Sequence, residues 1–306
     1  RPAVAHFYLP TSYCIVGPLA VLMRVPARLM SRRSLNDYLD TKPSAVARVE
    51  RWLHRRMVAV LANSEQVVGE LANEEHVSPE KLVLLRNGIE TRPLAVADQR
   101  TARRESLGVG ATCVVMAIVA NLIPYKGHLD LLQALMQLDP EQDWLLLVLG
   151  GDPRGHRQVL EQRAAELGLS ERIRFLGETS DVAEFLDGCD IGVLCSHEEG
   201  FSNALLEYME RALPVVATAV GGNTEAVVDG ETGLLVPPHA PEALARALGA
   251  LIGDEDLRLR MGMAGRSRVG REFSHDFSVA AYVELYEALL GGDRVPARLL
   301  APARTH

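Results

Sequence analysis

The stretch Cys113-Val-Val-Met-Ala-Ile-Val119 is a continuous apolar run rich in residues that favour strands. Such a run is typical of a strand that is buried on both faces of a parallel sheet. Residues 130–138 follow with apolar side chains at helical spacing, and residues 144–149 form another apolar run. A strand, a helix and a strand in this order indicate one unit of a parallel α/β sheet, because the connecting helix returns the chain alongside the first strand.

The same alternation continues through most of the chain. It predicts six strands of one doubly wound sheet, at 113–119, 144–149, 173–176, 191–195, 215–217 and 234–236, and helices at 130–138, 158–167, 182–186, 204–213, 241–252 and 277–290. Four earlier apolar runs predict a second α/β unit, with strands at 4–9, 27–30, 58–62 and 82–85. We therefore expect an α/β protein with two Rossmann-like doubly wound domains, at 1–95 and 96–290, a linker near 91–111 and a flexible tail at 291–306.

Composition and charge exclude several classes of protein. The chain has 306 residues, of which 48% are hydrophobic and 24% charged, the balance of an ordinary globular protein. A net charge of −8 and only 5% aromatic residues speak against a nucleic-acid partner. The four cysteines form no C-x-x-C pair, which disfavours a zinc or thioredoxin-like motif. With no apolar run near the ~20 residues of a membrane helix, we expect a cytoplasmic protein.

Basic residues gather in one window. Residues 24–56 hold nine Lys or Arg and three acids, so this window carries +6 and the rest of the chain −14. Such a surface could attract an anionic partner, either a phospholipid face or a phosphorylated acceptor. It could equally be a solvated helix face. A peripheral position at the inner face of a membrane therefore stays open.

The segment Ser196-His-Glu-Glu-Gly-Phe-Ser-Asn-Ala-Leu-Leu-Glu207 lies between a predicted strand and a predicted helix. In open α/β sheets, ligands bind at the carboxyl ends of the strands. Gly200 allows a close backbone approach, and the N–H groups of the helix start suit a diphosphate. Glu199 and Glu207 could accept hydrogen bonds from sugar hydroxyls on either side of it. The alternative is a helix with two surface glutamates.

Two further segments follow predicted strands, and the first of them lies at the same sheet edge. Ala120-Asn-Leu-Ile-Pro-Tyr-Lys-Gly-His128 offers Lys126 as a positive charge near a diphosphate and Gly127 as the turn into the helix. A loop lysine is also common as a solvated side chain. Ala219-Val-Gly-Gly-Asn-Thr-Glu225 is a Gly-rich turn between a strand and a helix, and alone it is a weak signal.

Taken in order, these segments resemble the C-terminal domain of the family 4 retaining glycosyltransferases of the GT-B fold, the group 1 glycosyl transferases. The motifs that match are Glu199-x7-Glu207, Pro124-x-Lys126-Gly127, the run 214–225 and Asp229-Gly230-x-x-Gly233-Leu-Leu-Val236. Asn87-Gly-Ile89 and Ala62-Asn-Ser64 match the region between that family's domains. The resemblance covers about residues 45 to 290.

The resemblance implies a retaining hexosyltransferase that uses a UDP- or GDP-sugar and needs neither a metal nor another cofactor. The acceptor would be a glycan, a lipid or a small molecule, in exopolysaccharide or glycolipid biosynthesis. Lys126 and Glu199 would be catalytic. Lys126 would act as a fixed cation, which can stabilise the charge that develops on the leaving diphosphate. The residues implied in donor binding are Asn121, Gly127, Gly200, Phe201, Ser202, Asn203 and Glu207, with Glu207 on the ribose.

The chain departs from the family pattern in two places. Asn121 stands where the family usually has Arg, so Arg154 or His128 would have to supply a second cation. The family's N-terminal domain begins earlier, so we expect this chain to be truncated and its first domain incomplete. His6 is the candidate for a His of the family, and Tyr13, Arg32 and Arg33 are the candidates for the acceptor side.

Three other functions are weighed against this one. A fragment that binds the nucleotide sugar but lacks a complete acceptor domain would be inert. A sugar-nucleotide epimerase or phosphorylase shares the fold, but the spacing of the two glutamates disfavours both. A dinucleotide oxidoreductase is disfavoured because no G-x-G-x-x-G follows any predicted strand.

Overall fold

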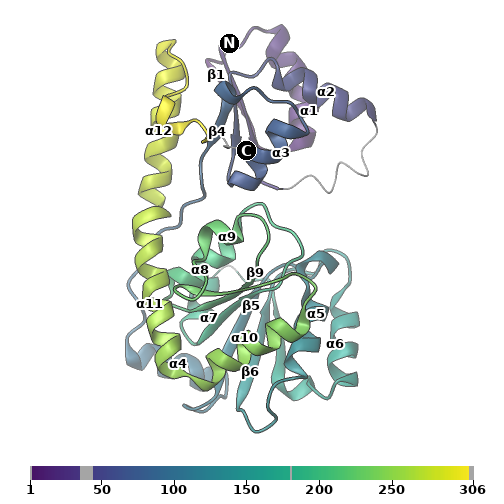
Figure 1. The fold of residues 1–306 in the computed structure, drawn as a ribbon, viewed down its shortest axis with the longest axis vertical. Coiled ribbons are helices and arrows are strands. Elements are labelled where there is room, and N and C mark those ends of the chain that lie inside the picture. Colours follow the sequence, from purple (N-terminus) through teal and green to yellow (C-terminus); the bar gives the residue numbers. More distant parts are fainter. Residues whose placement is uncertain (1, 35–43, 180, 303–306) are drawn as a thin grey trace. The chain divides into compact units, whose positions relative to one another are not determined.

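The computed structural model describes residues 2–34, 44–179 and 181–302. The chain forms two compact units, each built around a parallel sheet (Figure 1). Unit 1 comprises Arg1–Gly88, Glu199–Phe201 and His275–His306, and unit 2 comprises Ile89–Glu198 and Ser202–Ser274. None of the described helices is both long and apolar enough to cross a membrane.

Unit 1 contains a four-stranded parallel sheet in the order β1-β2-β3-β4. Its strands are β1 (Val4–Phe7), β2 (Ala27–Arg32), β3 (Ala59–Ala62) and β4 (Leu82–Leu84). The connections contain α1 (Pro10–Leu22), α2 (Ser44–His54), α3 (Glu65–Asn73) and the 3-10 turn η1 (Pro79–Lys81). All four strands lie on the apolar runs that predicted them, because each run supplies side chains to both faces of a buried sheet.

The last helix, α12 (His275–Gly291), belongs to unit 1 and not to the domain expected at 96–290. Its buried Ala281, Leu285 and Leu289 pack in one apolar cluster with side chains of β2, β3 and β4. The helical spacing of apolar residues predicts a helix here, but it holds no information on which sheet the helix covers. The domain boundary therefore differs from the one drawn on the sequence.

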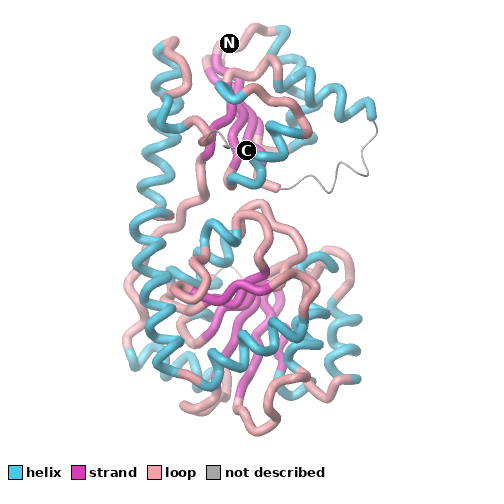
Figure 2. Tube along the Cα trace, viewed as in Figure 1, coloured by secondary structure: helices cyan, strands magenta, loops and turns pink. Residues whose placement is uncertain are grey.

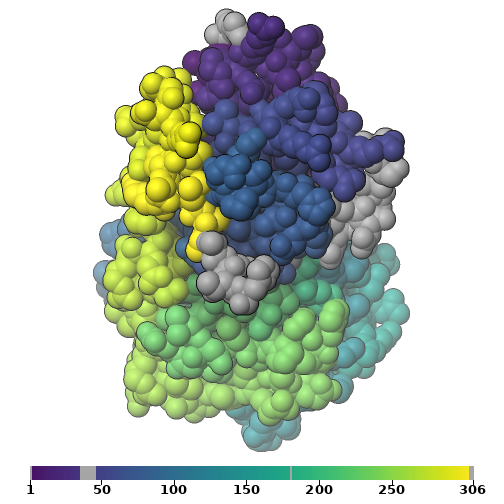
Figure 3. Space-filling view, turned by 45° about the horizontal axis from the view of Figure 1, so that its top comes forward, coloured from purple at the N-terminus to yellow at the C-terminus, as the bar shows by residue number. Residues whose placement is uncertain are grey.

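The residues after α12 also pack on unit 1, in contrast to the flexible tail expected at 291–306. They form the 3-10 turn η4 (Ala297–Leu299), and Leu299 is buried in the same cluster as α12. The N–H of Ala301 donates to the carbonyl of Leu82, 2.9 Å away. Figure 3 shows this C-terminal segment in yellow beside the blue residues of unit 1. An apolar side chain and a backbone donor thus fix the tail, of which residues 303–306 lie outside the described part.

Unit 2 contains a six-stranded parallel sheet in the order β10-β9-β8-β5-β6-β7. Figure 2 draws its strands in magenta and the helices around them in cyan. The strands are β5 (Val114–Val119), β6 (Trp144–Leu149), β7 (Ile173–Gly177), β8 (Ile191–Leu194), β9 (Val215–Thr218) and β10 (Gly233–Val236). Counted from β5, the chain adds two strands on one side and then three on the other. This is the strand order of a Rossmann-type sheet, and its switch point lies between β5 and β8. The predicted fold, two doubly wound α/β units, is confirmed.

Helices pack on both faces of this sheet. They are α4 (Ala97–Ser106), α5 (His128–Leu135), α6 (Arg157–Glu166), α7 (Val182–Leu186), α8 (Asn203–Glu210), α9 (Asn223–Ala226), α10 (Pro241–Gly253) and α11 (Glu255–Glu272), with 3-10 turns η2 (Pro124–Lys126) and η3 (Ser170–Arg172). The apolar side chains of α5, α6 and α10 join β5, β6 and β8 in one core cluster. Helix α4 lies inside the segment 91–111 that was expected to be a linker.

Helix α11 is the longest helix of unit 2 and was not predicted. Its sequence contains Gly262, Gly265 and Gly270, which lower helix propensity. Two of these glycines serve packing: a β carbon at Gly262 would collide with the carbonyl oxygen of Ala212, and one at Gly265 would press on Met209 of α8. The close approach of α11 to the α8 region thus requires Gly262 and Gly265. The same two glycines lower the helix propensity of the segment, so the helix was not predicted.

Candidate functional site

The carboxyl ends of β5 and β8 lie next to each other at the switch point of the sheet in unit 2. The loop after β5 leads through η2 into α5, and the loop after β8 leads into α8. In a doubly wound sheet the crevice at this point is the usual ligand site, because the connections that follow the two strands leave it in opposite directions. The motif segments 120–128 and 196–207 therefore begin next to each other.

The two loops are tied together by hydrogen bonds to the backbone carbonyls of η2 and its neighbours. The N–H of His197 donates to the carbonyl of Tyr125 at 2.7 Å, and the thiol of Cys195 lies 3.3 Å from the carbonyl oxygens of both Lys126 and Gly127. Gly127 has φ +72°, and a β carbon there would collide with the Cys195 carbonyl. Only glycine allows both this backbone conformation and this approach, so Gly127 holds Lys126 at the sheet edge.

Tyr208 fixes α8 on the sheet. Its hydroxyl accepts a hydrogen bond from the N–H of Val119 at 2.6 Å and donates to the carbonyl of Val193 at 3.1 Å. Its ring lies over Gly192 of β8, where a β carbon would collide with it. Because Tyr208 is fully buried, these contacts set the position of the adjacent Glu207. The sequence motifs do not point to Tyr208, although a glycine inside an apolar strand, here Gly192, indicates a close neighbour.

Ser202 takes the N-cap position of α8, but its side chain makes no capping hydrogen bond. Asn203 is the first helical residue. The remaining motif residues Glu199, Gly200 and Phe201 form the middle of the same loop and are counted with unit 1. The start of an eight-residue helix is therefore presented at the sheet edge, where its N–H groups favour an anion.

Glu207 faces a cavity of about 240 Å3 in unit 2. The cavity wall includes Val182, Ala183 and Leu186 of α7 and the segment 89–92. Burial raises the pKa of Glu207 from 4.5 to about 6, because the charged form loses hydration. A ligand that donates hydrogen bonds to this carboxylate would stabilise its charged form, because the hydrogen bonds replace the lost hydration. The apolar α7 residues were not expected as site residues, although α7 follows the carboxyl end of β7.

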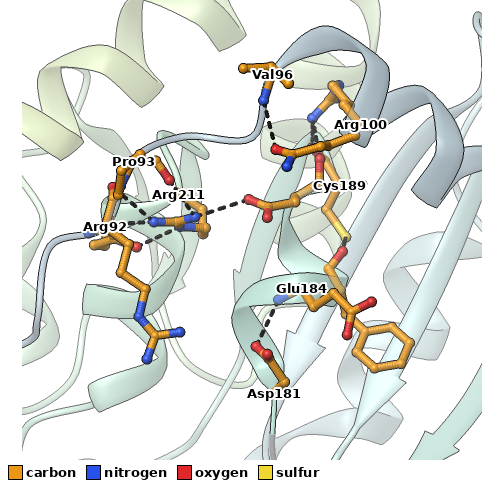
Figure 4. Close-up of polar contacts among 12 residues, drawn as sticks. Arg92, Pro93, Val96, Arg100, Asp181, Glu184, Cys189 and Arg211 are labelled. Carbon is orange, nitrogen blue, oxygen red and sulfur yellow. Dashed lines mark hydrogen bonds and ion pairs between the residues drawn. The ribbon is translucent and has the colours of Figure 1, made fainter.

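A buried ionic network anchors the wall of this cavity (Figure 4). The guanidinium of Arg211 donates to the backbone carbonyls of Arg92 and Pro93, each at 3.1 Å, and to the carboxylate of Asp187 at 3.2 Å. Glu210 accepts the N–H of Arg92 at 2.8 Å and pairs with Arg211. The segment 89–93 is thereby attached to the end of α8, one turn from Glu207.

Asn121 organises a neighbouring loop. Its side-chain oxygen accepts the N–H of Gly151 at 3.2 Å, and the carbonyl of Gly151 accepts the N–H of Leu122 at 2.8 Å. The loop after β6 is thus held next to the loop after β5. The amide oxygen of Asn121 can accept this hydrogen bond. The arginine that the family usually has at this position could not, because a guanidinium offers only donors.

The structure excludes His128 as the second cation, one of the two residues proposed for that role. His128 is buried against Leu131, Leu146 and Leu160, and among the described residues its ring nitrogens have no hydrogen-bond partner. Burial lowers the pKa of His128 to about 4, so the ring is neutral at pH 7 and supplies no charge. Arg154 is exposed in the loop after β6, and its role stays a prediction.

The Gly-rich turn after β9 joins the same edge. The hydroxyl of Thr218 donates to the carbonyl of Ser196 at 2.6 Å, and the amide of Asn223 donates to the carbonyl of Thr218 at 3.0 Å. The loops after β8 and β9 are therefore connected. The three motif segments therefore begin at the same edge of the sheet in unit 2, although Glu199–Phe201 of the second segment are counted with unit 1.

In unit 1, two of the residues considered for an acceptor are structural. Tyr13 is fully buried, and its hydroxyl contacts Nδ1 of His54 at 2.9 Å. Arg32 is buried and pairs with Glu75 at 2.9 Å. Both side chains are used inside the unit, so the expectation that they line an acceptor surface is wrong.

The other two candidates of unit 1 differ in exposure. His6 contacts the hydroxyls of Ser31 at 2.8 Å and Tyr286 at 2.7 Å, and burial lowers its pKa to about 4. It is a neutral hydrogen-bonding ring at the end of β1. Arg33 is exposed, with its guanidinium 5.6 Å from the ring of Tyr8.

Known proteins resemble this chain in sequence. Residues 99–268 match the family of glycosyl transferases, group 1. The D-inositol 3-phosphate glycosyltransferase of Corynebacterium glutamicum (strain R) is 30% identical over 315 residues, covering 96% of this chain and 75% of that protein. The protein of the same name from Streptomyces scabiei is 31% identical over 290 residues, covering 90% of this chain and 64% of that protein.

Solved structures resemble it in fold. HepE of Anabaena, crystallised with UDP, superimposes with a TM-score of 0.85 at 23% identity, covering 92% of this chain and 78% of that one. Sucrose-phosphate synthase of Thermosynechococcus elongatus has a TM-score of 0.82 at 25% identity, covering 95% and 74%. Both likenesses extend over the two units, and the fold is that of the GT-B glycosyltransferases. Together with the family match over more than half of its length, this shows that the chain belongs to the group 1 glycosyl transferases.

Proposed function

We propose that this protein transfers a hexosyl group, with retention, from a nucleotide-diphosphate sugar to a hydroxyl of its acceptor. The observation that carries the proposal is the half-buried carboxylate of Glu207, which faces a cavity beside the switch point of unit 2. The cis-diol of a ribose would offer this carboxylate two donors. The apolar side chains of Val182, Ala183 and Leu186 would border the nucleoside.

The diphosphate would lie at the joined loops. The backbone of Lys126 is held there by Gly127 and Cys195, and the start of α8 directs backbone N–H groups to the same edge. Breaking the anomeric bond builds negative charge on the leaving diphosphate, and a fixed ammonium with aligned N–H groups stabilises it. These groups would do so without a divalent ion. Glu199 would contact the sugar from the same loop.

The donor and the acceptor are proposed from relatives. HepE binds UDP and UDP-glucose in its crystals, which favours a UDP-sugar over a GDP-sugar. The relatives in Corynebacterium and Streptomyces are named for D-inositol 3-phosphate, which favours a small hydroxylated phosphate as acceptor over a growing polysaccharide. The nucleotide-binding fragment without turnover remains the second candidate, since the chain spans 64% of the Streptomyces relative.

Binding of the nucleotide is tested by calorimetry with UDP and GDP in the presence of EDTA. We expect binding without metal, and we expect Glu207→Ala to weaken it at least about tenfold through lost hydrogen bonds to the ribose. Glu141→Ala is the matched control, because Glu141 is exposed at the amino end of β6. Equal binding by the Glu207 variant, or no binding of either nucleotide, contradicts the proposal.

Transfer is tested with UDP-hexoses and inositol phosphates as a panel. Lys126→Ala should lower kcat about 100-fold or more, whereas Lys126→Arg should recover part of it because the charge is kept. NMR of the product at early times reports whether the anomeric configuration is retained. If UDP binds and no sugar moves from any donor, the fragment is inert and the second candidate holds.

A peripheral contact with anionic membranes is a further part of the proposal. Helix α1 exposes Ile15, Leu19 and Leu22, with 66%, 53% and 78% of each residue accessible. Arg48 and Arg51 are exposed on the neighbouring α2, while Arg28 and Arg32 of the basic window are bonded within unit 1 and Lys42 lies outside the described residues. Apolar side chains beside arginines suit an anionic interface.

Sedimentation with vesicles checks this contact. We expect binding to vesicles that contain phosphatidylserine, weakened by salt and by Leu22→Ser. Equal sedimentation with neutral vesicles would show that the arginines are a solvated face.

A further inference from the structure

Three potential metal ligands meet at the carboxyl edge of the sheet in unit 2. Asp130 lies in the first turn of α5, His197 in the loop after β8, and His239 in the turn between β10 and α10. Nε2 of His197 is 2.8 Å from Oδ2 of Asp130, and Nδ1 of His239 is 3.9 Å from the same oxygen. One ligand atom from each residue lies within 4.8 Å of the others.

The fold brings these side chains together from distant parts of the sequence. Helix α5 packs against α10, which places the first turn of α5 near the turn that precedes α10. His239 has φ +56°, a left-handed conformation that residues with a β carbon seldom adopt. Its ring lies 3.7 Å from that of His197, measured between ring centroids. The packing of α5 against α10 and the left-handed backbone at His239 thus bring the three side chains together.

We propose that Asp130, His197 and His239 bind one divalent transition-metal ion, for which Zn2+ is the best fit. Two imidazoles and one carboxylate are a donor set typical of Zn2+ and its neighbours, whereas Mg2+ and Ca2+ prefer oxygen ligands alone. A tetrahedral ion about 2.0–2.2 Å from each ligand holds them roughly 3.3–3.6 Å apart. The observed separations of 2.8 and 3.9 Å lie on either side of that range, so small side-chain rotations suffice.

The site remains accessible to an ion from solution. His239 is 65% exposed, and the side chains of His197 and Asp130 are 25% and 22% exposed. Three protein ligands leave the fourth position to water or another small ligand. The ion enters on the side of His239, and it replaces the hydrogen bond between His197 and Asp130.

A bound ion would join the first turn of α5, the loop after β8 and the turn between β10 and α10, close to the candidate donor site. Asp130 is four residues after Lys126, and His197 is two residues before Glu199. The proposal goes beyond the transferase activity, because the reaction proposed above draws its charge stabilisation from Lys126 and backbone N–H groups. The ion acts on the stability of the loops, since a ligand that binds only the folded state raises the melting temperature by mass action.

The test is titration of the EDTA-treated, dialysed protein with ZnCl2 in a calorimeter. We expect one ion per chain, and we expect His239→Asn and Asp130→Asn to weaken binding at least about tenfold. Asn tolerates the left-handed backbone at 239. His76→Asn is the matched control, because His76 is also exposed and also has φ +56°. Its affinity for Zn2+ should equal that of the unchanged protein.

Two further measurements keep the proposal open to refutation. Co2+ should give the visible absorption of a His-ligated ion in the unchanged protein and lose it in the His239 variant. Zn2+ should raise the melting temperature of the unchanged protein and of the His76 variant, but not that of the Asp130 variant. Circular dichroism and UDP binding show whether each variant is folded. Equal Zn2+ affinity of the His76 and His239 variants, or no binding by the folded unchanged protein, overturns the proposal.

Discussion

The aromatic ring of Tyr208 lies directly over Gly192, so that the α carbon of the strand and the ring of the helix occupy adjacent space. Gly192 is in the middle of β8, and Tyr208 follows Glu207 in α8. The contact lets α8 approach the sheet closely enough for the Tyr208 hydroxyl to bridge the ends of β5 and β8. The position of the candidate ribose-binding carboxylate thus depends on a missing side chain in a strand.

Gly192→Ala should destabilise the protein by about 1–3 kcal/mol, because the added methyl group forces the buried ring to move. Urea unfolding monitored by circular dichroism measures the loss. Gly249→Ala is the matched control: Gly249 lies inside α10, and the nearest atom to its added β carbon would be 3.8 Å away. That variant should be unchanged or up to about 1 kcal/mol more stable. Equal effects of the two substitutions would mean that the Tyr208 contact is not tight.

Tyr208→Phe should cost about 1–3 kcal/mol of unfolding free energy, because the buried N–H of Val119 loses the acceptor that it has in the structure. The same variant should weaken UDP binding, since α8 is less firmly placed. Tyr125→Phe serves as comparison, because Tyr125 is 40% exposed. Wild-type stability of the Tyr208 variant would contradict the bridge.

Glu207→Gln should make the protein more stable at neutral pH while it weakens nucleotide binding. The pKa of Glu207 is raised from 4.5 to about 6, so the folded state holds this proton more tightly than the unfolded state. Stability therefore falls as pH rises through this window and is lower by about 2 kcal/mol above it. Melting temperatures of both proteins between pH 4 and 8 check the sign. A constant difference at all pH values would refute the assigned titration.

Glu75→Gln should cost about 3 kcal/mol, because it removes the carboxylate that contacts Arg32 and His54 in the core of unit 1. Glu65→Gln breaks the pair with Arg86, in which both side chains are partly exposed, and should cost less than about 1 kcal/mol. Chemical denaturation compares the two losses. Similar small costs would show that the buried pair adds nothing beyond a surface pair.

The strands were predictable from sequence because a strand buried in a parallel sheet must be apolar along its whole length. All ten apolar runs became strands for this reason. The edge at which the site lies was predictable as well, since parallel strands bring their carboxyl ends together. Helix α11 was not, because Gly262 and Gly265 lower its propensity while they serve its packing.

Individual side chains were harder to place than elements. His128, Tyr13 and Arg32 all follow or lie near predicted strand ends, yet each is buried. Sequence position gives the edge of a sheet, whereas burial depends on which helix face turns inward. Conversely, Asp130 and His239 lie 109 positions apart and carried no motif, so their meeting emerges only from the packing of α5 against α10.

The docking of α12 on the first sheet has a consequence for how the polypeptide acquires its structure during translation. Strands β1 to β4 are synthesised before the strands and helices of unit 2, but the helix that covers Leu29, Leu61 and Val83 is synthesised after them. The apolar surface of that nascent sheet stays without this cover until about 200 further amino acids have been polymerised. The six-stranded sheet, whose strands and helices are all complete by residue 274, can assemble earlier, although it is synthesised second.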